Sequence, residues 1–216
     1  QTVAQDENTA WQIAESYRNL QKNTEAINFH RVVSNNNPNS IRGFKSSYWV
    51  SYLSHLEEQN AKVLGQNTTS NNLSKQSKEF DNLSYNVWIE LSSEDKNVLL
   101  NEFNLEVMKG LEGDNNLKCV PYVMFDYLSK YSKEQNNPNP AVDTAVTDGE
   151  DKAGEIAKHI RAIQKTAQRF GKLGLQEEEQ KTLELLQEFD PKSFSEDPKA
   201  QNIWTKNLID LAEKYR

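Results

Sequence analysis

The chain has little of what catalytic and metal sites are usually built from. Its 216 residues include one cysteine, three histidines and eight glycines. The lone Cys119 excludes an internal disulfide framework, favours an intracellular location, and lies in an apolar run typical of a buried structural thiol. His30, His55 and His159 lie far apart and lack metal-ligand spacing. The sequence therefore predicts no metal and no cofactor.

Catalytic signatures are missing as well. The chain has no glycine-rich phosphate loop, no His-Glu-x-x-His, no paired Cys-x-x-Cys and no Gly-x-Ser-x-Gly. No catalytic residue is predicted, and a protein that is not an enzyme is favoured. An enzyme whose residues meet only in the folded chain stays open as the alternative.

Long hydrophobic runs and a basic charge balance are also lacking. No apolar run approaches the roughly 20 residues that a membrane-spanning helix needs, so a soluble protein is expected. The chain begins at Gln1 without a signal-peptide pattern, so we expect a processed or partial chain whose targeting segment is missing. The formal net charge of -7 is unlike that of a typical nucleic-acid-binding domain.

What the chain does contain is helical periodicity. Four Trp, eight Tyr and eight Phe supply large side chains for a core. Apolar residues recur at three- and four-residue steps, and no segment alternates with period two. The sequence therefore predicts an all-α protein of about eight helices, near residues 9–33, 47–64, 80–91, 93–110, 120–134, 148–173, 176–189 and 197–215.

Composition also predicts how the chain is divided. Residues 135–148 contain two prolines and lack periodicity, which is typical of a linker. We therefore predict an N-terminal helical domain over residues 1–134 and a C-terminal domain over residues 149–216. The short joints of the C-terminal domain favour an antiparallel three-helix bundle.

Three further expectations concern the N-terminal domain. Residues 66–77 have almost no apolar content and are predicted to form a mobile loop. The helix at 120–134 is apolar on several sides and is expected at the centre of the core. Trp49, Trp88 and Phe125 lie on apolar helical faces and are expected to be buried.

One helix has a distinctive charge pattern. Residues 158–174 contain five basic residues and no Asp or Glu. At 100° per residue, the basic residues fall within an arc of about 80°, opposite an apolar stripe. We call the basic set the basic ridge, which comprises Lys158, Arg161, Lys165, Arg169 and Lys172. The opposite set is the apolar seam, which comprises Ile156, Ile160, Ile163, Ala167 and Phe170.

The basic ridge has two interpretations. It is either a solvated face that balances the Glu-rich helix after it, or a binding surface for an anion. An acidic protein partner, anionic lipid and nucleic acid all offer such anions. The leading hypothesis is a non-catalytic helical protein–protein interaction module, part of a larger protein or assembly. The alternative is a helical nucleic-acid-binding accessory domain that uses the ridge. The sequence predicts no oligomeric state.

Overall fold

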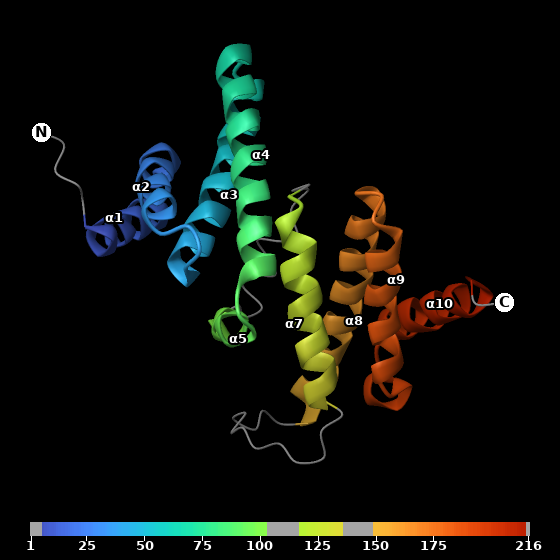
Figure 1. The fold of residues 1–216 in the computed structure, drawn as a ribbon. Coiled ribbons are helices and arrows are strands. Elements are labelled where there is room, and N and C mark those ends of the chain that lie inside the picture. The colour runs from blue at the N-terminus through green and yellow to red at the C-terminus, as the bar shows by residue number, and fades with distance from the viewer. Residues whose placement is uncertain (1–5, 103–116, 136–148, 215–216) are drawn as a thin grey trace, which may run out of the picture. The chain divides into compact units, whose positions relative to one another are not determined.

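The computed structural model describes residues 6–102, 117–135 and 149–214 (Figure 1). Within these ranges the protein is all-α, with nine α-helices, two short 3-10 helices and no strand. The predicted fold class is therefore confirmed. The elements are α1 (Glu7–Asn19), α2 (Asn23–Asn36), α3 (Ile41–Val63), α4 (Asn67–Glu90), α5 (Ser93–Glu102), α7 (Cys119–Gln135), α8 (Gly149–Lys172), α9 (Gln176–Glu184), η1 (Leu185–Glu188), η2 (Pro191–Phe194) and α10 (Pro198–Lys214).

Contacts divide the chain into two compact units, Gln1–Val120 and Pro121–Arg216. The division falls within the first turn of α7, so most of this helix belongs to unit 2. Its aromatic side chains pack there, with the rings of Tyr122 and Phe170 centred 5.0 Å apart. The expectation that this helix centres the first core is therefore wrong. The predicted linker lies outside the described residues beyond Gln135, and the separable domains at 1–134 and 149–216 stay a prediction.

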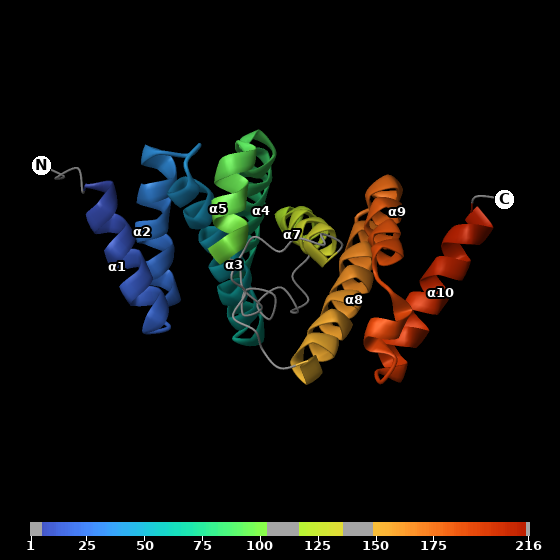
Figure 2. The same ribbon diagram turned by 90° about the horizontal axis from the view of Figure 1, so that it is seen from below.

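Unit 1 contains a row in which α1 packs on α2, α2 on α3, and α3 on α4 (Figure 2). The sequence predicts one helix from 9 to 33, but a turn splits it into α1 and α2. Gln21 adopts φ 57°, and the Lys22 N–H donates to the Tyr17 carbonyl at 2.9 Å. This left-handed turn lacks glycine, the residue that normally marks such a turn, so the sequence pattern missed it.

The α3–α4 contact is lined by buried serines, which also corrects the predicted loop at 66–77. The Ser51 hydroxyl donates to the Ser77 carbonyl at 2.8 Å, and the Ser77 hydroxyl donates to the Ser51 carbonyl at 2.9 Å. Small side chains let two helix backbones approach closely, and the Ser51 and Ser77 hydroxyls stay hydrogen-bonded. α4 therefore begins at Asn67 despite its polar sequence. We call the buried set the serine interface, which comprises Ser51, Ser54, Ser70, Ser77 and Ser84.

The core cluster of unit 1 uses residues from α2, α3 and α4. Ala26, Ile27, Val50, Leu53 and Phe80 form one buried cluster. Trp88 is 1% exposed, as predicted, and its ring centre lies 5.1 Å from that of Phe44. Trp49 and, in unit 2, Phe125 are partly exposed, so these two are less buried than predicted.

Two helices that follow the α4 segment begin at side-chain caps. Ser92 accepts the Asp95 N–H at 3.0 Å and donates its hydroxyl to the Asp95 carboxylate at 2.8 Å, a side-chain N-cap that starts α5. α7 is capped from a distance. Asp81 of α4 accepts the N–H groups of Lys118 and Cys119 at 2.7 and 3.0 Å. These donors precede and open α7, so a residue of α4 fixes where α7 starts.

In unit 2, α8 packs on α9 and α10, and the turn after α8 uses Gly174 at φ 76°. The predicted apolar seam of α8 is confirmed, because all five of its residues are buried. The α9 region ends in η1 and η2 before α10 starts. The Trp204 indole N–H donates to the Leu186 carbonyl at 2.8 Å, which fastens α10 to η1.

Candidate functional site

The basic ridge lies on α8 as predicted, but its five members differ in exposure. Lys158, Lys165 and Lys172 are exposed, whereas Arg161 and Arg169 are partly buried. The three lysines are spaced seven residues apart, so they form a line of about 21 Å along the helix. Whether this line binds anything remains a prediction.

Arg161 has an internal role that the sequence pattern did not reveal. Its guanidinium donates to the Asp197 carboxylate at 2.7 Å. Asp197 also accepts the Ala200 N–H at 2.9 Å, which caps α10. The Ala200 N–H and Arg161 together hold the pKa of Asp197 below its usual value of 3.8. Arg161 therefore joins α8 to the start of α10, which favours a structural explanation for this part of the ridge.

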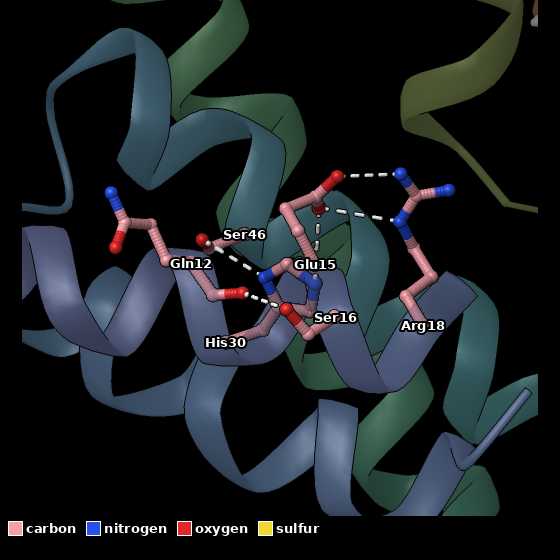
Figure 3. A network of polar contacts seen from close by, with 6 residues as sticks. All are labelled: Gln12, Glu15, Ser16, Arg18, His30 and Ser46. Carbon is pink, nitrogen blue, oxygen red and sulfur yellow. Dashed lines mark hydrogen bonds and ion pairs between the residues drawn. The ribbon is translucent and has the colours of Figure 1, made fainter. Parts of the chain in front are cut away.

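A second candidate is a polar network in unit 1 that joins three helices (Figure 3). Glu15 of α1, His30 of α2 and Ser46 of α3 meet there. The His30 ring lies with Nδ1 3.3 Å from the Ser46 hydroxyl and Nε2 3.6 Å from the Glu15 carboxylate. Arg18 donates its Nε–H to the same carboxylate at 3.2 Å. The network thus connects α1, α2 and α3 through one imidazole.

Burial dominates the electrostatics of His30, which is fully buried. Loss of hydration lowers its pKa from 6.5 to about 4, because the charged form is disfavoured away from water. The Glu15 carboxylate opposes this shift and Arg18 adds to it. His30 is therefore neutral at pH 7.

An acid, an imidazole and a hydroxyl in series resemble the order of a hydrolase triad. Unlike a hydrolase triad, this network is closed to substrate, because both Ser46 and His30 are 0% exposed. A nucleophile must reach its substrate, and the hydrogen bonds here stay inside the contact between helices. This network therefore supports packing of α1, α2 and α3 and not acyl transfer.

Arg18 extends the network to the surface of unit 1. Its guanidinium carbon lies 4.3 Å from the centre of the Trp49 ring, a cation–π contact between α1 and α3. Trp49 in turn packs edge-on against Tyr48 and Tyr52. This partly exposed aromatic face is therefore held in place by a charged residue of the neighbouring helix.

Cys119 is fully buried next to Asp81, as the predicted structural thiol. Burial, and then the Asp81 carboxylate, raise the pKa of the thiol well above 9.0. The thiolate is the nucleophilic and metal-binding form, so this cysteine is expected to be unreactive. Burial also raises the pKa of Asp81 above 3.8. The two N–H groups that donate to its carboxylate lower the pKa and offset only part of this shift.

Within residues 6–102, 117–135 and 149–214, no group of three His, Cys, Asp or Glu side chains is arranged to hold a metal ion. No described helix has the length and apolar character needed to cross a bilayer.

Exposed apolar side chains are the remaining feature. Val63 and Leu64, which are adjacent, are 88% and 69% exposed at the turn between α3 and α4. Leu20 is 66% exposed at the turn between α1 and α2. Val63 and Leu20 fit the apolar periodicity of the helices predicted at 47–64 and 9–33, but both are exposed because each lies at the end of a helix.

Over the residues that the structure describes, the fold defines an all-α helical protein. Comparison with protein-family models, with curated proteins and with solved structures found no match for the chain.

Proposed function

We propose that the chain is a non-catalytic helical module that binds another protein. The observation that carries this proposal is the adjacent pair Val63 and Leu64, exposed by 88% and 69% at the α3–α4 turn. Exposed apolar surface in water is unfavourable, and its burial against a partner is worth about 25 cal/mol per Å². An apolar surface on a partner protein is the occupant that this turn fits.

The serine interface and the core cluster support the proposal indirectly. The Ser51–Ser77 hydrogen bonds and the core cluster hold α3 and α4 together away from the turn, so Val63 and Leu64 are not needed for this packing. The turn can therefore bury its apolar side chains against a partner while the hairpin keeps its fold.

The test compares the full chain with a Val63→Ser, Leu64→Ser double variant in capture from native extract, with and without nuclease. Ile89→Ser serves as the matched control, because Ile89 is 50% exposed elsewhere in unit 1. We expect one set of proteins, unaffected by nuclease, to be lost with the double variant and kept with the control. Equal capture by all three chains at equal stability would contradict the proposal.

A second candidate is nucleic-acid binding through the basic ridge, which the exposed line of Lys158, Lys165 and Lys172 favours. Its test is fluorescence anisotropy with single- and double-stranded probes at low salt. If the lysines follow a phosphate backbone, changing all three to Gln weakens binding to every sequence alike. The salt slope of log affinity then falls by about one unit per charge. No binding by the unmodified chain at low salt would exclude this candidate.

A further inference from the structure

His159 is fully buried in unit 2, where two residues of α7 enclose its ring. The ring of Tyr131 lies on the imidazole with ring centres 3.4 Å apart and planes 3° apart. The ring of Tyr127 stacks at 5.7 Å and 19°. We call these three residues the histidine–tyrosine stack. It joins the second half of α7 to the first half of α8.

The hydrogen bonds of His159 define its neutral form. Nδ1 lies 2.8 Å from the Glu155 carbonyl, and Nε2 lies 3.3 Å from the Tyr127 hydroxyl. A carbonyl only accepts, so the ring proton sits on Nδ1 and Nε2 accepts from Tyr127. Both ring nitrogens are thus satisfied while the ring is neutral.

A second proton disturbs this arrangement in two ways. Nε2 becomes a donor and faces the hydroxyl proton of Tyr127, so that hydroxyl has to turn. The ring also becomes a buried cation, and the described contacts around it are two phenol rings and a backbone carbonyl. Cation–π attraction to the tyrosines offsets only part of the lost hydration.

The charges near the ring add to this cost. On α8 itself, the Lys158 ammonium repels a second cation. From α7, the titratable groups on the ring are the phenols of Tyr127 and Tyr131. The apolar ring of Phe189, just after η1, stacks with Tyr131 at 6.4 Å between ring centres. His30 differs, because a carboxylate, that of Glu15, lies 3.6 Å from its Nε2.

We propose that the histidine–tyrosine stack is an acid-sensitive lock, which holds α7 on α8 while His159 is neutral and releases α7 when His159 is protonated. The inference is independent of the proposed protein-binding function. His159 then has a regulatory role besides its role in the packing of the core.

The electrostatics of His159 decide which pH favours the closed form. Burial lowers the pKa of His159 from 6.5 to about 4, and Lys158 adds to the shift. The open form therefore binds a proton that the closed form resists. The stabilisation is complete above pH 6.5 and is lost as pH falls toward 4. Over that window the closed-to-open ratio falls about tenfold per pH unit.

The test uses the full chain and two measurements. NMR titration of the imidazoles reports when His159 takes a proton. Hydrogen exchange of α7 and α8 amides, corrected for the intrinsic pH dependence of exchange, reports opening. We expect His159 to stay neutral in the folded chain at pH 5.5. We also expect amide opening to rise by up to tenfold per unit below pH 6.5.

His159→Phe keeps a buried aromatic ring and removes the titration, so α7 opening should lose this pH dependence. His159→Gln is a second, polar replacement that does not titrate. His30→Phe is the matched control in unit 1 and should leave the pH dependence of α7 unchanged. Titration of His159 near pH 6.5 with α7 still protected would overturn the proposal. An unchanged pH dependence in both His159 variants would overturn it as well. If neither variant folds, the NMR titration still decides.

Discussion

At the scale of single residues, buried polar groups in this protein mostly serve to start or join helices. Asp81 shows this clearly, because its two oxygens accept the N–H groups of Lys118 and Cys119 at 2.7 and 3.0 Å. A carboxylate suits this position, since it is acceptor-only and the N-terminus of a helix favours negative charge. The cap and the buried thiol therefore form one structural unit.

Asp81→Asn tests the cap. The amide has one accepting oxygen, so one of the two N–H groups faces an NH₂ group and loses its partner. We expect a loss of about 1–2 kcal/mol in the free energy of unfolding, measured by urea denaturation. Asn82→Ala is the control, because Asn82 is the exposed neighbour. Equal stability of the two variants would show that the cap is not needed.

Trp88 is the residue whose removal should cost unit 1 most. It is 1% exposed and packs on Phe44, whereas Trp49 is partly exposed beneath Arg18. We expect Trp88→Ala to lower the free energy of unfolding by about 3–5 kcal/mol. Trp49→Ala should cost clearly less, because part of that ring already contacts water. A chemical denaturation series with both variants checks the order.

At the scale of elements, close helix packing in unit 1 depends on small side chains. Ser51 and Ser77 exchange hydroxyl-to-carbonyl hydrogen bonds across α3 and α4, and Ser70 and Ser84 lie seven residues to either side of Ser77. A larger residue at this interface has no room without moving a helix backbone. The small size of these serine side chains therefore matters more than their polarity.

Ser77→Leu tests this view. The added volume should force α3 and α4 apart and cost about 1–3 kcal/mol from overpacking, besides the lost hydrogen bond. Lys78→Leu is the matched control, since Lys78 is the exposed neighbour on α4. Thermal unfolding of the two variants gives the comparison. Tolerance of leucine at both positions would mean that the helices can separate freely.

Asp197 links α8 to α10 through an ion pair with Arg161 and also caps α10, and two variants distinguish these contributions to stability. Arg161→Gln removes the partly exposed ion pair alone and should cost only about 0.2–1 kcal/mol. Asp197→Ala also removes the cap of α10 and should cost about 1 kcal/mol more. Because the pKa of Asp197 is lowered, its contribution is present above pH 3.8 and is lost as pH falls through the lowered value. Denaturation at pH 7 and pH 3 checks both the order and the sign.

At the scale of the whole molecule, each unit has its own buried cluster. Phe170 belongs to unit 2, where it is 1% exposed and contacts Tyr122. We expect Phe170→Ala to raise hydrogen exchange in α8 and α9 strongly, at a cost of about 3–5 kcal/mol to that unit. Amides of α2 and α3 should keep their exchange rates. Equal increases in both units would show that the chain unfolds as one body.

Local features of the fold depend on neighbouring residues. The Ser92 hydroxyl accepts the Asp95 N–H within one helical turn, and Gly65 and Gly174 adopt positive φ at helix ends. The apolar seam of α8 was predictable for the same reason, since its residues repeat at three and four positions.

The candidate site was less predictable. The position of the basic ridge followed from periodicity, but the pairing of Arg161 with Asp197 joins residues far apart in sequence. The same holds for the meeting of Glu15, His30 and Ser46, because periodicity placed Glu15 and His30 on one helix over residues 9–33 and left Ser46 just before the next helix. No local signal in the sequence marks such a meeting.

The sequence by itself determined that this protein is helical and which face of α8 is apolar. Only the tertiary structure decided that Gln21 turns the chain, that Asn67–Glu90 is helical, and that α7 packs on α8. Helix propensity and amphipathic periodicity act within a few residues, so they can be read along the chain. Whether a serine is solvated or buried, and whether an imidazole stays neutral, depends on which distant helix lies against it.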